Sequence, residues 1–315
     1  MKRIGILTSG GDAPGMNAAI RAVVRAAMYY DIIPYGIYDG YKGLVEGNIE
    51  RLGRFSDCIN LGGTKLCTSR LPEFKEVAVR EKAIENMKTF GLEALVVIGG
   101  DGSYRGARDL VDMGVNCMCL PGTIDNDIAS TDFTIGFDTA LNTILDAIDK
   151  LRDTSSSHQR CNIIEVMGRR CGDLAVYASV CGGAEVVVTG ETDFDKPSII
   201  KHLQDCYNAG KRHAIVVITE KITDVHEFAR EVEENTGFNS RATVLGHVQR
   251  GGYPSAKDRV LASSLGVYAV DLLVQGYKGQ CVGLINNKLA HTEIHEALNM
   301  KRQKSYLYDI SAKLL

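Results

Sequence analysis

Short apolar runs that end in glycine and aspartate recur along the chain. The run Leu95–Ile98 leads into Gly99-Gly100-Asp101-Gly102-Ser103, and a second apolar run leads into PGTIDND at residues 121–127. Apolar runs of this length, bounded by turn residues, are typical of buried strands. Because open parallel α/β sheets bind ligands beyond the carboxyl ends of their strands, we expect both segments to face one ligand.

The N-terminal stretch repeats this arrangement. A strand predicted at residues 3–8 is followed by SGGDAPGMN (9–17) and by a helical pattern at 18–30. A glycine-rich turn before a helix presents N–H groups and the helix dipole to phosphate. Gly10 and Gly15 have P-loop spacing, but Met16 replaces the required lysine, and the G-x-G-x-x-G spacing is absent. This pattern disfavours a dinucleotide-dependent oxidoreductase.

The second half alternates strand and helix patterns. Its strands are expected at residues 162–166, 185–188, 213–219 and 242–245, with helices that include 173–180 and 197–208. The alternation predicts two Rossmann-like, three-layer α/β/α domains with mainly parallel sheets and an active site in the cleft between them. The polar stretch 152–160, after a helical run at 139–151, is typical of a domain boundary. Residues 37–44 are interpreted as a strand end with a turn.

Composition narrows the class of protein. The 315 residues are 45% hydrophobic and 24% charged, with a formal net charge of -3, so neither nucleic acid nor membrane binding is expected. The 9 cysteines lack zinc-like spacing, which favours reduced thiols in a cytoplasmic protein. A strand is predicted at the very start of the chain, so we expect no signal peptide.

The glycine and aspartate segments suggest phosphate chemistry. Glycines 99, 100 and 102 leave the main chain bare enough to approach phosphate oxygens, and Asp101 is suited to hold Mg²⁺. A lone segment of this kind is equally typical of a tight turn with a capping aspartate. The second half offers arginines, a glutamate and a histidine after its strands, the groups that suit a phosphorylated sugar. A single arginine is more often solvated surface charge, so only the joint placement favours a site.

Six sequence motifs resemble those of one known protein family. They are LTSGGDAPGMNA (7–18), IGGDGS (98–103), PGTIDND (121–127), RDTSSSHQR (152–160), EVMGR (165–169) and LGHVQRGG (245–252). Over essentially its whole length the chain resembles the bacterial ATP-dependent 6-phosphofructokinases. The resemblance implies transfer of a phosphoryl group from Mg²⁺-bound ATP to the 1-hydroxyl of fructose 6-phosphate. It also implies an ATP-binding domain at 1–138 plus about 252–302, and a smaller fructose 6-phosphate domain at about 139–251 plus 303–315.

The resemblance implies roles for individual residues. Asp125 is the expected general base, Thr123 and Asp127 position the reacting groups, and Arg169 stabilises the phosphoryl group in transit. The expected ATP-binding residues are Gly11, Tyr41, Arg70, Leu71, Asp101, Gly102, Ser103 and Gly106, with Asp101 as metal ligand. The expected sugar phosphate contacts are Thr123, Asp125, Asp127, Arg160, Met167, Gly168, Arg169, Glu220, Arg241, His247 and Arg250. Arg160 and Arg241 match arginines from a neighbouring subunit, which implies a homotetramer with shared active sites.

A regulatory site is also implied by the resemblance. A nucleoside diphosphate (ADP) would activate there and phosphoenolpyruvate would inhibit. The expected effector-binding residues are Arg21, Arg25, Arg54, Asp57, Arg152, Gly183, Glu185, Lys211, Arg212 and His213. Ala209 and Leu61 replace basic residues of the family pattern, so we expect weaker or altered effector binding.

Three alternatives remain open. Pyrophosphate-dependent relatives carry Asp at the position of Gly102 and Lys at that of Gly122, so the two glycines favour ATP. A kinase of dinucleotides or lipids shares the Gly-Gly-Asp-Gly loop but does not explain the arginines of the second half. A non-catalytic nucleotide-sensing homologue is disfavoured by the joint presence of Thr123, Asp125 and Arg169.

Overall fold

A computed structural model describes residues 1–169 and 171–314. The chain divides into two compact units, Met1–Thr139 with Arg250–Arg302, and Ala140–Gln249 with the segment from Gln303 onward. Thr139 and Arg250, expected in the second domain, therefore lie in the first. The reason is local: Thr139 donates its N–H to Asp258 Oδ2 at 2.8 Å, and Arg250 Nη1 donates to the carbonyl of Asp12 at 3.2 Å.

The first unit is built on a seven-stranded sheet in the order β11-β10-β5-β4-β1-β2-β3. Its strands are β1 (Arg3–Ser9), β2 (Ile33–Ile37), β3 (Ile49–Arg51), β4 (Ala94–Gly99), β5 (Cys117–Pro121), β10 (Gln280–Ile285) and β11 (Lys288–Glu293). The strands from β10 to β2 are parallel, and only the edge strands β11 and β3 pair antiparallel. The central strands β1, β4 and β5 are almost wholly buried, as their apolar runs predicted.

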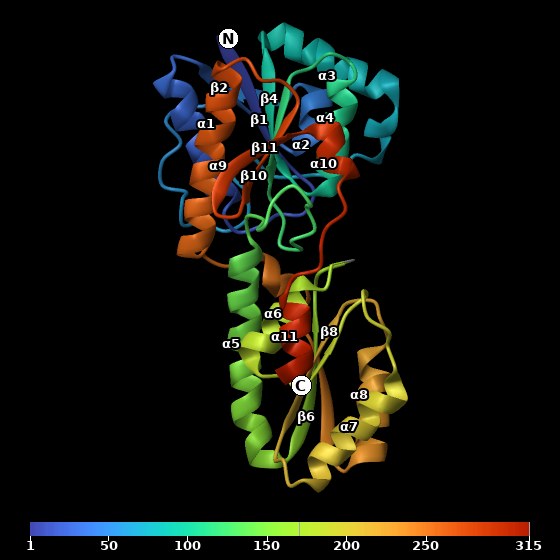
Figure 1. Ribbon diagram of the computed structural model, residues 1–315. Helices are drawn as coiled ribbons and strands as arrows, with labels where there is room; N and C mark the ends of the chain where they lie inside the picture. The colour runs from blue at the N-terminus through green and yellow to red at the C-terminus, as the bar shows by residue number, and fades with distance from the viewer. Residues whose placement is uncertain (170, 315) are drawn as a thin grey trace. The chain divides into compact units, whose positions relative to one another are not determined.

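Helices cover both faces of this sheet (Figure 1). One face is covered by α1 (Met16–Tyr29) and α9 (Ala256–Val274). The other carries α2 (Gly40–Glu46), α3 (Val77–Phe90), α4 (Asp101–Val111), α10 (Ile294–Asn299) and the 3₁₀ turn η1 (Pro72–Lys75). The expected three-layer arrangement is therefore confirmed for this unit.

The second unit has a smaller, all-parallel sheet in the order β7-β8-β6-β9. Its strands are β6 (Arg160–Val166), β7 (Val186–Val188), β8 (Ala214–Thr219) and β9 (Asn239–Val244). Helices α6 (Asp173–Gly182) and α11 (Leu307–Leu314) lie on one side, and α7 (Lys196–Asn208) and α8 (Val225–Thr236) on the other (Figure 1). The mainly parallel sheets predicted from the sequence are thus confirmed in both units.

Two local predictions were wrong. Helix α5 (Phe137–His158) continues through most of the expected polar break, because its serines satisfy their hydroxyls on the helix itself. Ser156 Oγ donates to Arg152 O at 3.1 Å and Ser157 Oγ to Asp153 O at 3.4 Å. Residues 37–44 were interpreted as a strand end with a turn, but the chain from Gly40 to Glu46 forms α2. In the part of the chain that the structure describes, none of the helices combines the length and apolar character that crossing a bilayer requires.

Candidate active site

The register of the first sheet brings three segments side by side. Ser9 pairs with Gly99 across β1 and β4, and Gly99 pairs with Pro121 across β4 and β5. Ser103 Oγ donates to Ser9 O at 2.9 Å, and Gly122 N donates to Gly99 O at 3.0 Å. The residues after these strands, which include Gly11, Asp101–Ser103 and Thr123–Asp127, therefore lie at one edge of the sheet.

Close packing explains some of the glycines in this region. A Cβ on Gly99 would stand 2.4 Å from Ser103 Oγ and 2.5 Å from Ser9 O, so no larger residue fits without moving the backbone. Gly10 has a φ of +88°, which glycine adopts without strain. The α-carbon of Gly102 instead has open space, with nothing within 4 Å of an added Cβ.

Tyr41 is fixed against the start of α4. Its hydroxyl donates to Ser103 O at 2.6 Å, and burial raises its pKa well above the usual value, so the phenol stays protonated and donates. A Cβ on Gly106 would lie 2.7 Å from Tyr41 Cε2, so the bare α-carbon of Gly106 makes room for the ring. The structure thus brings together three of the residues expected at the nucleotide site.

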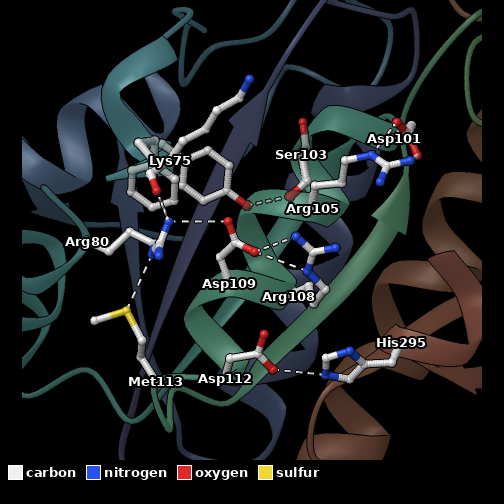
Figure 2. Close-up of polar contacts among 12 residues, drawn as sticks. Lys75, Arg80, Asp101, Ser103, Arg105, Arg108, Asp109, Asp112, Met113 and His295 are labelled. Carbon is white, nitrogen blue, oxygen red and sulfur yellow. Dashed lines mark hydrogen bonds and ion pairs between the residues drawn. The ribbon is translucent and has the colours of Figure 1, made fainter. Parts of the chain in front are cut away.

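Sequence reasoning missed the residues that hold Tyr41 in place. Phe74 of η1 stacks on the Tyr41 ring with centroids 4.3 Å apart. Arg80 Nη1 donates to Phe74 O at 3.0 Å and to Lys75 O at 2.8 Å, and pairs with Asp109 at 3.3 Å (Figure 2). Arg80 is 9% exposed, so these bonds satisfy a nearly buried charge. No motif contains Arg80, and its partners include two backbone carbonyls, which leave no pattern in the sequence.

Asp101 is the expected metal ligand. It lies in the first turn of α4, and its carboxylate accepts from Arg105 Nε at 2.9 Å and Nη2 at 3.1 Å (Figure 2). Within the described residues, no cluster of three or more His, Cys, Asp or Glu side chains could hold a metal ion. Mg²⁺ is commonly bound by one or two carboxylates together with substrate phosphates. Asp101 fits that single-carboxylate role if Arg105 yields one oxygen.

The candidate base, Asp125, lies in the loop after β5. Asp125 is 6% exposed, and its N–H donates to Thr123 Oγ1 at 3.2 Å. Hydrogen bonds within the loop connect its two ends. Thr134 Oγ1 donates to Thr123 O at 2.6 Å, and Thr134 N donates to Asn126 Oδ1 at 2.9 Å. Asp127, two residues on, is half-buried. The structure thus places both carboxylates beside the glycine segments described above.

The second unit gathers another set at the carboxyl ends of its strands. Arg169 N donates to Glu220 Oε1 at 3.1 Å, across the ends of β6 and β8. Met167 N donates to the side-chain oxygen of Gln249 at 3.1 Å. Gln249 is completely buried in the 3₁₀ turn η2 (Gly246–Arg250); it lies in the LGHVQRGG motif, but sequence reasoning assigned it no role. Burial, with a smaller contribution from Glu220, raises the pKa of Glu165.

Other expected substrate residues lie elsewhere in the second unit. His247 is exposed on η2. Arg160 begins β6, and Arg241 pairs with Asn162 near the same end of the sheet. The strand length from Arg160 to Val166 is roughly 20 Å at about 3.3 Å per residue. The structure therefore does not bring Arg160 and Arg241 together with Met167–Arg169. In the first unit, Arg70 is exposed, and Leu71 packs against the core.

The expected effector residues fall into two groups. In the first unit, Arg21 and Arg25 lie one turn apart on α1, and Arg25 Nη2 donates to Ser56 Oγ at 3.3 Å, near the exposed Arg54 and Asp57. In the second unit, a cavity of about 520 Å³ is lined in part by Gly183, Glu185 and Lys211.

Ion pairs and hydrogen bonds connect that second group. Lys211 Nζ lies 2.7 Å from Glu185 Oε1. Arg152 Nη2 donates to Gly183 O at 3.2 Å. Ser156 bonds both remaining residues, through its carbonyl to Arg212 Nε at 3.3 Å and through its hydroxyl to His213 Nδ1 at 3.0 Å. Among these basic side chains, Lys211 lines the cavity, Arg152 contacts the cavity residue Gly183, and Ser156 joins Arg152, Arg212 and His213.

At adjoining strand ends the chain thus has bare glycine backbone, a carboxylate at a helix start and a buried aspartate. These features are typical of proteins that handle phosphorylated ligands. The family model for phosphofructokinase matches residues 3–273. The chain belongs to the phosphofructokinase family. It is 59% identical over 318 aligned residues to the ATP-dependent 6-phosphofructokinase of Vibrio campbellii, covering all of this chain and 99% of that one.

Solved structures agree with this assignment. Phosphofructokinase of Pichia pastoris is 35% identical, with a TM-score of 0.89 over 99% of this chain and 36% of that longer one. A pyrophosphate-dependent phosphofructokinase of Marinobacter aquaeolei, 21% identical, has a TM-score of 0.87 over 98% of this chain and 86% of that one. This second likeness shows a shared fold only.

Proposed function

We propose that the protein transfers the γ-phosphoryl group of ATP to the 1-hydroxyl of fructose 6-phosphate, giving fructose 1,6-bisphosphate and ADP, as a step of glycolysis. The observation that carries the proposal is Asp125, a nearly buried carboxylate in a self-bonded loop beside the glycine segments. The names and identities of the relatives, spread over the whole chain, support the same reaction.

The chemistry requires positioning more than covalent assistance. Asp125 takes the proton of the sugar 1-hydroxyl as its oxygen attacks the γ-phosphorus, and ADP departs with the bridging oxygen. Thr123 and Asp127 orient the nucleophile from the same loop. Arg169 stabilises charge on the phosphoryl group. Asp101, together with the ATP phosphates, would hold Mg²⁺, which would supply further charge neutralisation there.

The sugar phosphate is proposed to contact Met167, Gly168, Glu220, His247 and Arg250 of the same chain. Arg160 and Arg241 are proposed to reach the site of a neighbouring subunit in a cytoplasmic homotetramer. Their position supports this: Arg160 lies roughly 20 Å of strand from the end of β6 that leads to Met167–Arg169, and Arg241, which pairs with Asn162, lies roughly 13 Å from it.

Regulation by a nucleoside diphosphate and phosphoenolpyruvate is proposed at the effector residues. Lys211 lines the cavity and is half exposed, so its ammonium group can meet a phosphate there. When a phosphate binds, the ion pair between Lys211 and Glu185 would have to break, or Lys211 would have to contact both the carboxylate and the phosphate. Arg21, Arg25 and Arg54 are proposed to serve the same effector from a neighbouring subunit.

The test is a coupled assay for fructose 1,6-bisphosphate with the wild type and Asp125→Ser. Loss of the base is expected to lower kcat about 10²- to 10⁴-fold with KM little changed. Asp149→Ser, an exposed aspartate on α5, is the matched control and should retain activity. Wild-type protein that turns over neither with ATP nor with pyrophosphate would refute the reaction and favour a binding subunit.

A further inference from the structure

Arg250 lies against the first glycine segment of its own unit. Its Nη1 donates to the carbonyl of Asp12 at 3.2 Å. A Cβ on Gly11 would stand 2.4 Å from that nitrogen, 3.0 Å from Cζ and 3.3 Å from Nη2. The whole guanidinium group therefore rests on the bare α-carbon of Gly11.

The backbone does not explain why residue 11 is glycine. Gly10 has a φ of +88°, whereas Gly11 is not among the residues with positive φ. Alanine is therefore compatible with the main chain at position 11, and the three nearest atoms that its Cβ would meet all belong to Arg250. These atoms form the far end of a flexible side chain, so a methyl group would displace the guanidinium group rather than the fold.

We propose that Gly11, a residue of the nucleotide segment, is a positioning residue for Arg250 and thereby sets the affinity for the sugar phosphate. The inference rests on the proposed function, in which Arg250 binds the phosphate of fructose 6-phosphate. Guanidinium groups bind phosphate through paired hydrogen bonds of fixed geometry. A displaced Arg250 guanidinium group therefore loses one or both of these directional hydrogen bonds. Gly11 thus links the two substrate subsites through one contact.

The experiment measures fructose 6-phosphate binding by calorimetry without nucleotide, in the wild type, Gly11→Ala, Arg250→Ala and the double variant. Gly11→Ala is expected to raise the Kd roughly 10- to 100-fold, the range for a lost charged hydrogen bond. In the Arg250→Ala background, Gly11→Ala should have no further effect, because the group that it displaces is gone. Equal effects in both backgrounds would overturn the proposal.

Gly53→Ala is the matched control. An added Cβ at Gly53 meets nothing within 4 Å, and its φ is not positive, so its Kd for fructose 6-phosphate should equal that of the wild type. A Gly11→Ala protein with altered ATP affinity but unchanged Kd for fructose 6-phosphate would also overturn the inference. If Gly11→Ala folds only together with Arg250→Ala, the steric link is supported; failure to fold in both backgrounds refutes it.

The proposed reaction and the proposed role of Gly11 can be refuted separately. Wild-type protein that neither binds fructose 6-phosphate nor turns over would refute the proposed function. Wild-type protein that does both, with Gly11→Ala indistinguishable from it in fructose 6-phosphate binding, would leave the function standing and remove only the role of Gly11.

Discussion

Gly102 and Gly122 follow adjacent strands but differ in the room around their α-carbons. A Cβ on Gly102 has nothing within 4 Å, whereas one on Gly122 would lie 3.0 Å from Ile98 Cγ2 and 3.2 Å from Met16 Cε. A substitution at Gly102 can therefore test the choice between ATP and pyrophosphate as phosphoryl donor without a steric clash at the added Cβ. The sequence argument treated the two glycines alike, because packing around an α-carbon cannot be read from the motif.

Gly102→Asp is expected to raise the KM for ATP roughly tenfold or more, since a carboxylate there repels the nucleotide phosphates. The melting temperature should hold or rise, because an acidic residue replaces glycine in the first turn of α4. Steady-state kinetics and thermal denaturation measure the two effects separately. Gly102→Asn has nearly the same size without the charge and should leave the KM within a few-fold; equal losses in both variants would point to bulk instead.

At this residue scale, the sequence located side chains that lie within motifs. The structure confirms that Thr123–Asp127, Gly11 and Asp101–Ser103 follow neighbouring strands. Sequence reasoning assigned no role to Arg80, which lies outside the motifs, or to Gln249, which lies inside LGHVQRGG. Arg80 pairs with Asp109, and Gln249 accepts from Met167 N, so both make contacts with distant segments. Such contacts depend on tertiary packing and leave no periodic or spaced pattern in the sequence.

At the scale of elements, apolar runs predicted the buried strands well, because a strand covered on both faces is apolar throughout. Helix α2 was missed since Gly40 and Gly43 suggest a turn, yet a Cβ at Gly43 would lie 1.6 Å from Tyr38 O, so glycine there permits close packing of the chain. The extension of α5 was missed because serine is a weak helix former, whose hydroxyl competes for backbone hydrogen bonds.

The end of α7 offers a prediction about regulation. Ala209 is the exposed C-cap of this helix, two residues before Lys211 of the cavity. Ala209→Lys adds an ammonium group where the helix dipole favours a cation, and is expected to lower the half-activating ADP concentration about fivefold or more. Activation curves at low fructose 6-phosphate measure it. Asn208→Lys adds the same charge about 100° away around the helix; an equal gain there, or none at 209, would contradict the proposed effector site.

At the scale of the whole molecule, sequence alone cannot place residues that serve another copy of the chain. Arg241 is an exposed strand residue whose Nη1 pairs with Glu233 at 3.0 Å, which by itself resembles ordinary surface charge. Its position at the opposite strand end from Met167–Arg169 gives the proposed sharing of sites a physical basis.

Mixed oligomers test that sharing. Asp125→Ser and Arg241→Ala proteins, each with low activity, are dissociated together and reassembled. If Arg241 serves a neighbour, some sites in the hybrid combine an intact Asp125 with an intact Arg241, so activity should rise severalfold above that of either parent. A mixture of Asp125→Ser and Asp127→Ser is the control, because both carboxylates lie in one loop and each site in the hybrid lacks one of them. Recovery in neither mixture, despite hybrids verified by native mass spectrometry, would show that each chain completes its own site.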